Sequence, residues 1–174
     1  MVEMIEDKFT GPMVWDADTQ FLNDGVASLD ATCQSEISVI AQLLRDNPLP
    51  TEALMPADFD MPACTAVMEG VRETVDNGTG FAVVDRLDVD GLGREIATKI
   101  YWLLMSIAGR PVAQKWDGTM VYDVHDTGGK ATPGSGIRSS KTNGGQGFHN
   151  DNAFNLPPDF VSLFCLRTAK KGGV

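Results

Sequence analysis

The sequence predicts an α+β domain or a β-sandwich flanked by helices. Two observations carry this prediction. Apolar residues recur at helical spacing in three segments before residue 110, whereas most segments with strand character follow residue 115. Helices that precede a run of strands are typical of folds in which the two kinds of element segregate. At 174 residues, of which 43% are hydrophobic, the chain is long enough to bury the core of a single domain over residues 1–174.

Three helices are expected, over residues 29–47, 62–77 and 91–108. Asp30 suits the N-cap of the first helix, and Pro62 suits the first turn of the second. Gly78 is expected to end the second helix in the left-handed conformation. Each helix carries an apolar stripe at helical spacing. The stripes are Ile37, Ile40, Ala41 and Leu44; Ala63, Val67, Val71 and Val75; and Leu92, Ile96, Ile100, Leu103 and Ile107.

Strands are expected over residues 80–84, 119–124 and 160–166. The last of these runs is apolar throughout, which predicts a buried strand. Residues 1–115 would then form a mainly helical flank, and residues 116–174 the first strands of the core. The three cysteines, Cys33, Cys64 and Cys165, are widely spaced within apolar patterns. We therefore expect reduced core residues and not a disulfide frame or a zinc site.

The charge of the chain bounds its partners. A net charge of −10 argues against sequence-independent nucleic-acid binding and against an anionic membrane surface. Residues 1–8 are acidic where a signal peptide would be basic, and no stretch reaches the length of a transmembrane helix. We expect a cytoplasmic protein with no nucleic-acid or membrane partner. The sequence does not indicate an oligomeric state.

The strongest chemical signal is the pair His149 and Asp151. In an extended segment these two side chains point to the same face, because side chains alternate along a strand. One imidazole and one carboxylate are two-thirds of the 2-His-1-carboxylate site that suits Fe(II). The flanking aromatic residues Phe148 and Phe154 are typical of a half-buried strand. A chance His-x-Asp pair on the surface is the competing interpretation.

Two other motifs have weaker readings. His125, beside Asp123 and Asp126, is either a third ligand or an exposed residue at the end of a strand. Lys141-Thr142 resembles the end of a phosphate-binding loop, but Ser140 and Ser135 stand where that motif requires glycine. We therefore set nucleotide binding aside.

Residues 138–143 (Arg-Ser-Ser-Lys-Thr-Asn) and 148–154 (Phe-His-Asn-Asp-Asn-Ala-Phe), with Pro157-Pro158 and the apolar run that follows, resemble the TauD/TfdA family of Fe(II)/2-oxoglutarate dioxygenases. An opening Gly-Pro-x-x-Trp segment and the helices agree. The resemblance implies a double-stranded β-helix, or jelly roll, with helices outside. It also implies that His149 and Asp151 bind Fe(II) and that 2-oxoglutarate is the cosubstrate.

The same resemblance implies that a second iron-binding His and an Arg for 2-oxoglutarate lie beyond Val174. The chain would then be the N-terminal portion of the domain, with weak metal binding and no turnover by itself. Polar residues near the iron motif are candidates for substrate contact: Gln146, Asn152, Arg138 and Asn143. The expected reaction is hydroxylation or another oxidation of a small molecule by O₂, with release of succinate and CO₂. The alternative is a jelly-roll binding or scaffold protein without catalysis.

Overall fold

A computed structural model describes residues 7–16, 18, 25–130, 132, 134–137, 141–145, 149 and 157–168. By internal contacts the chain divides into two compact units. Unit 1 comprises Met1–Arg110 and Phe164–Val174, and unit 2 comprises Pro111–Leu163. The regular elements of the described residues all belong to unit 1. The assignment of residues 1–174 to one domain stays a prediction.

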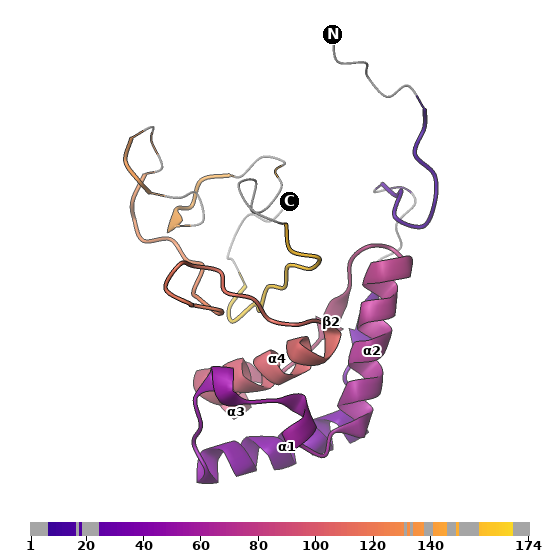
Figure 1. Cartoon of the computed structure of the whole chain (residues 1–174), viewed down its shortest axis with the longest axis vertical. Helices are drawn as coiled ribbons and strands as arrows, with labels where there is room; N and C mark the ends of the chain where they lie inside the picture. The colour runs from indigo at the N-terminus through magenta and orange to yellow at the C-terminus, as the bar shows by residue number, and fades with distance from the viewer. Residues whose placement is uncertain are drawn as a thin grey trace. The chain divides into compact units, whose positions relative to one another are not determined.

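Three long helices form the core of unit 1: α1 (Ala31–Asp46), α2 (Pro62–Asn77) and α4 (Arg94–Ala108). They pack on one another, as Figure 1 shows, and α4 contacts both of the others. Two short 3₁₀ helices, η1 (Thr51–Ala53) and η2 (Pro56–Asp58), connect α1 to α2 and pack on α4. Among the described residues, no helix is both long and apolar enough to cross a membrane.

The helix positions follow from the apolar spacing and the caps. The Asp30 carboxylate accepts hydrogen bonds from the backbone N–H groups of Thr32 and Cys33, both at 2.9 Å, so Asp30 is the N-cap of α1 as predicted. All four residues of the predicted α1 stripe are buried. The boundaries predicted for α1 are correct to within two residues, and those for α2 agree with the structure.

Three details of the helices differ from the prediction. The buried face of α2 consists of Cys64, Met68 and Val71, so Val71 is the one buried residue of the predicted stripe, whereas Ala63, Val67 and Val75 are half-buried. Gly78 has a φ of −103°, so it is not in the left-handed conformation. The third helix is broken at Gly93, whose φ of 78° no helical residue adopts, into α3 (Val89–Leu92) and α4.

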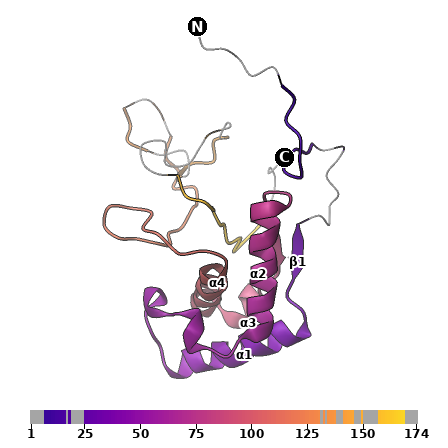
Figure 2. The same cartoon turned by 45° about the vertical axis from the view of Figure 1, so that its right-hand side comes forward.

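A small parallel sheet lies beside the helices. Strands β1 (Val26–Ser28) and β2 (Val83–Asp85) pair in parallel, with Val26 opposite Val83. Strand β1 runs alongside α2 (Figure 2). The prediction of a strand over 80–84 placed β2 slightly early, and β1 was missed because a three-residue strand has no measurable alternation.

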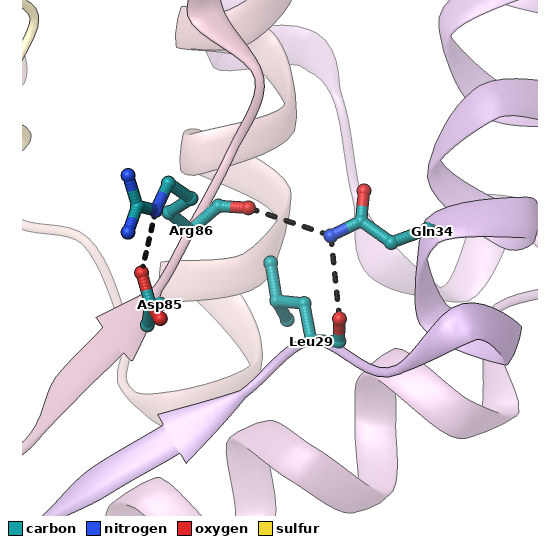
Figure 3. A network of polar contacts seen from close by, with 4 residues as sticks. All are labelled: Leu29, Gln34, Asp85 and Arg86. Carbon is teal, nitrogen blue, oxygen red and sulfur yellow. Dashed lines mark hydrogen bonds and ion pairs between the residues drawn. The ribbon is translucent and has the colours of Figure 1, made fainter.

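Gln34 of α1 ties the ends of both strands together (Figure 3). Its side-chain N–H group donates to the carbonyl oxygens of Leu29, at 3.3 Å, and Arg86, at 3.4 Å. The Leu29 backbone N–H also donates to the Asp85 carbonyl at 3.1 Å. The two bonds from Gln34 attach the sheet to α1. A two-stranded sheet is only marginally stable alone, so this attachment stabilises it.

The expected strands over 119–124 and 160–166 are not formed in the described residues, and these predictions were wrong. A strand is stabilised by the ladder of a neighbouring strand, and neither segment pairs with one. The second segment is not buried either: Val161 is 60% and Leu163 83% exposed. Cys165 is exposed, so its assignment to the core was also wrong. The described part is therefore α+β with few strands, and it does not contain the strands of a jelly roll.

Candidate metal centre

The predicted metal centre falls in unit 2 and is described only in part. His149 is exposed. Asp151, Gln146, Asn152 and Arg138 lie outside the described residues, so their assignment stays a prediction. Of the predicted substrate contacts, Asn143 is described and is exposed.

The donor chemistry of the pair fits a ferrous ion. A neutral imidazole and a carboxylate, two residues apart, are the ligand types that Fe(II) takes in a 2-His-1-carboxylate site. Within the described residues, no group of three or more His, Cys, Asp or Glu side chains comes together to hold a metal. His125 is exposed and belongs to no such group.

Lys141 connects the segment before His149 to an earlier part of unit 2. Its ammonium group donates to the Asp123 carbonyl at 3.1 Å. Its own carbonyl oxygen accepts two hydrogen bonds from Thr127, one from the backbone N–H and one from the hydroxyl, both at 2.9 Å. Lys141 is half-buried, whereas Asp123 and Thr127 are exposed.

A turn follows Lys141 directly. The Thr142 hydroxyl oxygen accepts a hydrogen bond from the Gly144 backbone N–H at 3.2 Å. Threonine side chains commonly close local turns in this way. Thr142 therefore closes a local turn shortly after Lys141.

A second turn in unit 2 is well defined. The Gln114 N–H donates to the Thr119 carbonyl at 2.7 Å, and the Asp117 carboxylate accepts from the Thr119 N–H and hydroxyl. The hydrogen bond from the Thr119 hydroxyl, with that from its backbone N–H, lowers the pKa of Asp117 below its usual range. The turn presents Trp116 at 99% exposure.

Unit 1 holds an open cavity of about 450 Å³. It lies between η2, the start of α2 and the end of α4, and Phe59, Asp60 and Ile107 are among its lining residues. The predicted site residues are not part of its lining. The cavity therefore adds nothing to the metal centre.

The contacts of Lys141 were not predicted from the sequence. Lys141 and Thr127 are fourteen residues apart, with seven residues between Lys141 and the predicted ligand. Neither Thr127 nor Lys141 lies in a predicted helix or strand, so no periodic pattern indicates the contact. The Lys141-Thr142 pair is a local signal at this position, but it resembles the end of a phosphate-binding loop and does not indicate these contacts.

Two comparisons with known proteins bear on this site. Residues 45–174 match the family model described as taurine catabolism dioxygenase TauD, TfdA family. FR-33289 synthase from Streptomyces rubellomurinus is 25% identical over 174 residues, an alignment that covers 99% of this chain and 50% of that protein. The chain thus spans about half the length of this curated relative.

Proposed function

Because this chain belongs to the TauD/TfdA dioxygenase family, we propose that the protein is an Fe(II)- and 2-oxoglutarate-dependent dioxygenase that hydroxylates or otherwise oxidises a small molecule. The family uses Fe(II) and 2-oxoglutarate, and family membership implies a jelly-roll fold. The observation that carries the proposal is that the matched range, residues 45–174, includes the His149-x-Asp151 motif.

In this proposal His149 and Asp151 hold the metal. The neutral imidazole donates a nitrogen lone pair, and the carboxylate offsets part of the charge of the ion. When bound, Fe(II) and 2-oxoglutarate supply the activation of O₂, with succinate and CO₂ as products. Gln146, Asn152, Arg138 and Asn143 are proposed to orient the substrate. A cytoplasmic location belongs to the same proposal.

The two histidines of the chain give a matched pair of variants. His149→Ala should abolish 2-oxoglutarate-dependent succinate formation by the intact protein, because the metal loses a ligand. His125→Ala should retain it, because His125 is an exposed residue assigned no ligand role. Succinate release, with a panel of candidate small molecules as substrates, is the measurement.

A second measurement keeps the test independent of the substrate. Binding of Fe(II), or of Co(II) as a spectroscopic probe, should weaken in His149→Ala and in Asp151→Ala but not in His125→Ala. Metal binding that survives both ligand substitutions would refute the assignment. Absence of both metal binding and succinate formation in the wild type would instead favour the alternative of a jelly-roll scaffold without catalysis.

A further inference from the structure

The cavity of unit 1, between η2, the start of α2 and the end of α4, has the size and the walls of a small-molecule site. Its volume of about 450 Å³ lies within the range of about 300–1,000 Å³ that is usual for ligand pockets. Such pockets combine apolar walls with a few polar groups that orient the ligand. Apolar and polar side chains both line this cavity, among them Phe59, Met61 and Ile107, and Asp60, Thr65 and Ser106.

The polar side chains of the lining offer hydrogen-bond acceptors. The Thr65 hydroxyl donates to the Met61 carbonyl at 2.8 Å, and the Ser106 hydroxyl donates to the Trp102 carbonyl at 2.7 Å. Because a carbonyl oxygen only accepts, each hydroxyl has its single proton committed, and its oxygen can still accept from a ligand. The ionised Asp60 carboxylate also accepts and carries a negative charge. A polar group of a ligand that meets these side chains must therefore donate.

A primary ammonium group matches these acceptors. It has N–H donors and no acceptor, and its positive charge complements Asp60. The ring face of Phe59 attracts a cation as well. Asp60 is exposed, and an ion pair at an exposed carboxylate is weak by itself. The ligand therefore also needs an apolar body to pack on Met61, which is buried, and Ile107, which is half-buried.

We propose that this cavity binds a small molecule that carries a protonated primary amine on an apolar body, such as an arylalkylamine. Asp60 pairs with the ammonium group, and the hydroxyl oxygens of Thr65 and Ser106 accept its N–H groups. The apolar body packs on the walls formed by Met61 and Ile107. The site goes beyond the proposed function and stands without it, because its residues belong to unit 1 and take no part in the proposed metal centre.

Titration of the intact protein with 2-phenylethylammonium, followed by NMR of carbon-13-labelled methionine methyl groups, tests the site. The Met61 signal, assigned from Met61→Leu, should shift saturably because Met61 lines the cavity. Met68 of α2 is fully buried outside that lining, so its signal is the internal reference. 2-Phenylethanol keeps the apolar body and lacks the charge, so it should bind about threefold more weakly. 3-Phenylpropanoate should not bind measurably, because its carboxylate would meet that of Asp60.

Asp60→Asn and Asp58→Asn are a matched pair of variants. Each removes one negative charge from an exposed residue just before α2, and of the two Asp60 lines the cavity. Asp60→Asn should weaken binding of the amine about threefold to fivefold, the ratio that corresponds to loss of an exposed ion pair, and should leave binding of 2-phenylethanol nearly unchanged. Asp58→Asn should bind the amine as the wild type does. Ile107→Trp places a larger side chain in the wall and should weaken both ligands.

Three results would each overturn the site. The first is the lack of a saturable Met61 shift with the amine. The second is equal affinity for the amine and 2-phenylethanol. The third is equal weakening in Asp60→Asn and Asp58→Asn, because the general acidity of the surface would then explain the binding. Far-ultraviolet circular dichroism should match the wild type in every variant, and if Ile107→Trp does not fold, the comparison of Asp60→Asn with Asp58→Asn decides.

Discussion

At the scale of single residues, the three cysteines lie in two contrasting environments. Cys33 of α1 and Cys64 of α2 are fully buried, and the Cys64 thiol donates to the Cys33 carbonyl oxygen at 3.7 Å. Burial raises the pKa of both thiols, and the Asp30 carboxylate near Cys33 and the Glu36 carboxylate near Cys64 raise them further. Cys165 is exposed. Since the thiolate is the reactive form, the buried pair should be inert.

We therefore predict that iodoacetamide labels only Cys165 in the native protein near pH 8. Cys33 and Cys64 should be labelled only after unfolding in guanidinium chloride, as mass spectrometry of tryptic peptides would show. In Cys165→Ser, native labelling should be lost. Rapid native labelling of Cys33 or Cys64 would contradict their burial between α1 and α2.

At the scale of elements, α1 supplies the cap that α2 lacks. Met61, at the N-cap of α2, makes no side-chain cap. Instead, the two carboxylate oxygens of Glu36 accept hydrogen bonds from the backbone N–H groups of Ala63 and Cys64, both at 2.8 Å. A carboxylate at this place also interacts favourably with the positive end of the helix dipole. Glu36 of α1 thus joins the two helices by accepting hydrogen bonds from N–H groups in the first turn of α2, which have no partner within that helix.

The cap makes the stability of unit 1 depend on pH. Burial raises the pKa of Glu36, but the hydrogen bonds from Cys64 and Ala63 together outweigh it, so the pKa lies below the ordinary value of 4.5. A lowered folded-state pKa contributes stability above the unfolded value, and this stability is lost as pH falls through the folded value.

We predict that Glu36→Gln costs about 1–2 kcal/mol of unfolding free energy at neutral pH, the usual range for a lost charged cap. The difference from wild type should shrink as pH falls from 4.5 through the lowered pKa of Glu36 in the folded protein, because the wild-type carboxylate is protonated below that pKa. Urea unfolding at several pH values measures both effects. Glu69→Gln changes the same charge at an exposed position of α2 and is the control. A pH-independent difference would contradict the cap.

At the scale of the whole molecule, features that depend on local residue spacing, such as helix boundaries, were predicted from the sequence. Features that depend on pairing with distant segments, such as strands, were not. The stripe and cap of α1 are periodic and local, so its boundaries were predicted closely. The apolar run 160–166 was equally clear but is no strand, because strand pairing needs a neighbour that local pattern does not reveal. His149 was proposed from a local pattern, whereas the hydrogen bonds of Lys141 with Thr127 and Asp123 join residues that no spacing rule connects.

The distribution of buried residues indicates which part of the chain folds by itself. Every buried hydrophobic side chain of the described residues lies between Leu29 and Leu104. The contacts of this core with residues 164–168 include the stacking of Tyr101 on Phe164, with ring centroids 5.0 Å apart, and an exposed ion pair of Arg167 with Asp90. Such stacking contributes only about 0.5–1.5 kcal/mol. The core should therefore survive without those residues.

We predict that a fragment of residues 25–110 folds cooperatively. Loss of the Tyr101–Phe164 stacking and of the Trp15–Phe81 ring contact should lower its Tm by roughly 4–8 °C per kcal/mol relative to the intact chain. Trp102 is the only tryptophan in this fragment, and its indole N–H donates to the Leu54 carbonyl at 3.0 Å inside the core. Its fluorescence and the far-ultraviolet circular dichroism should therefore report one coincident transition.

Leu103→Ala provides the internal control, because Leu103 is fully buried in α4 and its truncation should cost about 2–5 kcal/mol. A fragment that is helical but shows no cooperative transition, and that does not respond to this substitution, would mean that the helices do not form a core alone. Residues outside 25–110 would then be required to order Trp102. A transition that Leu103→Ala lowers would instead identify α1, α2 and α4 as the independently stable part of the molecule.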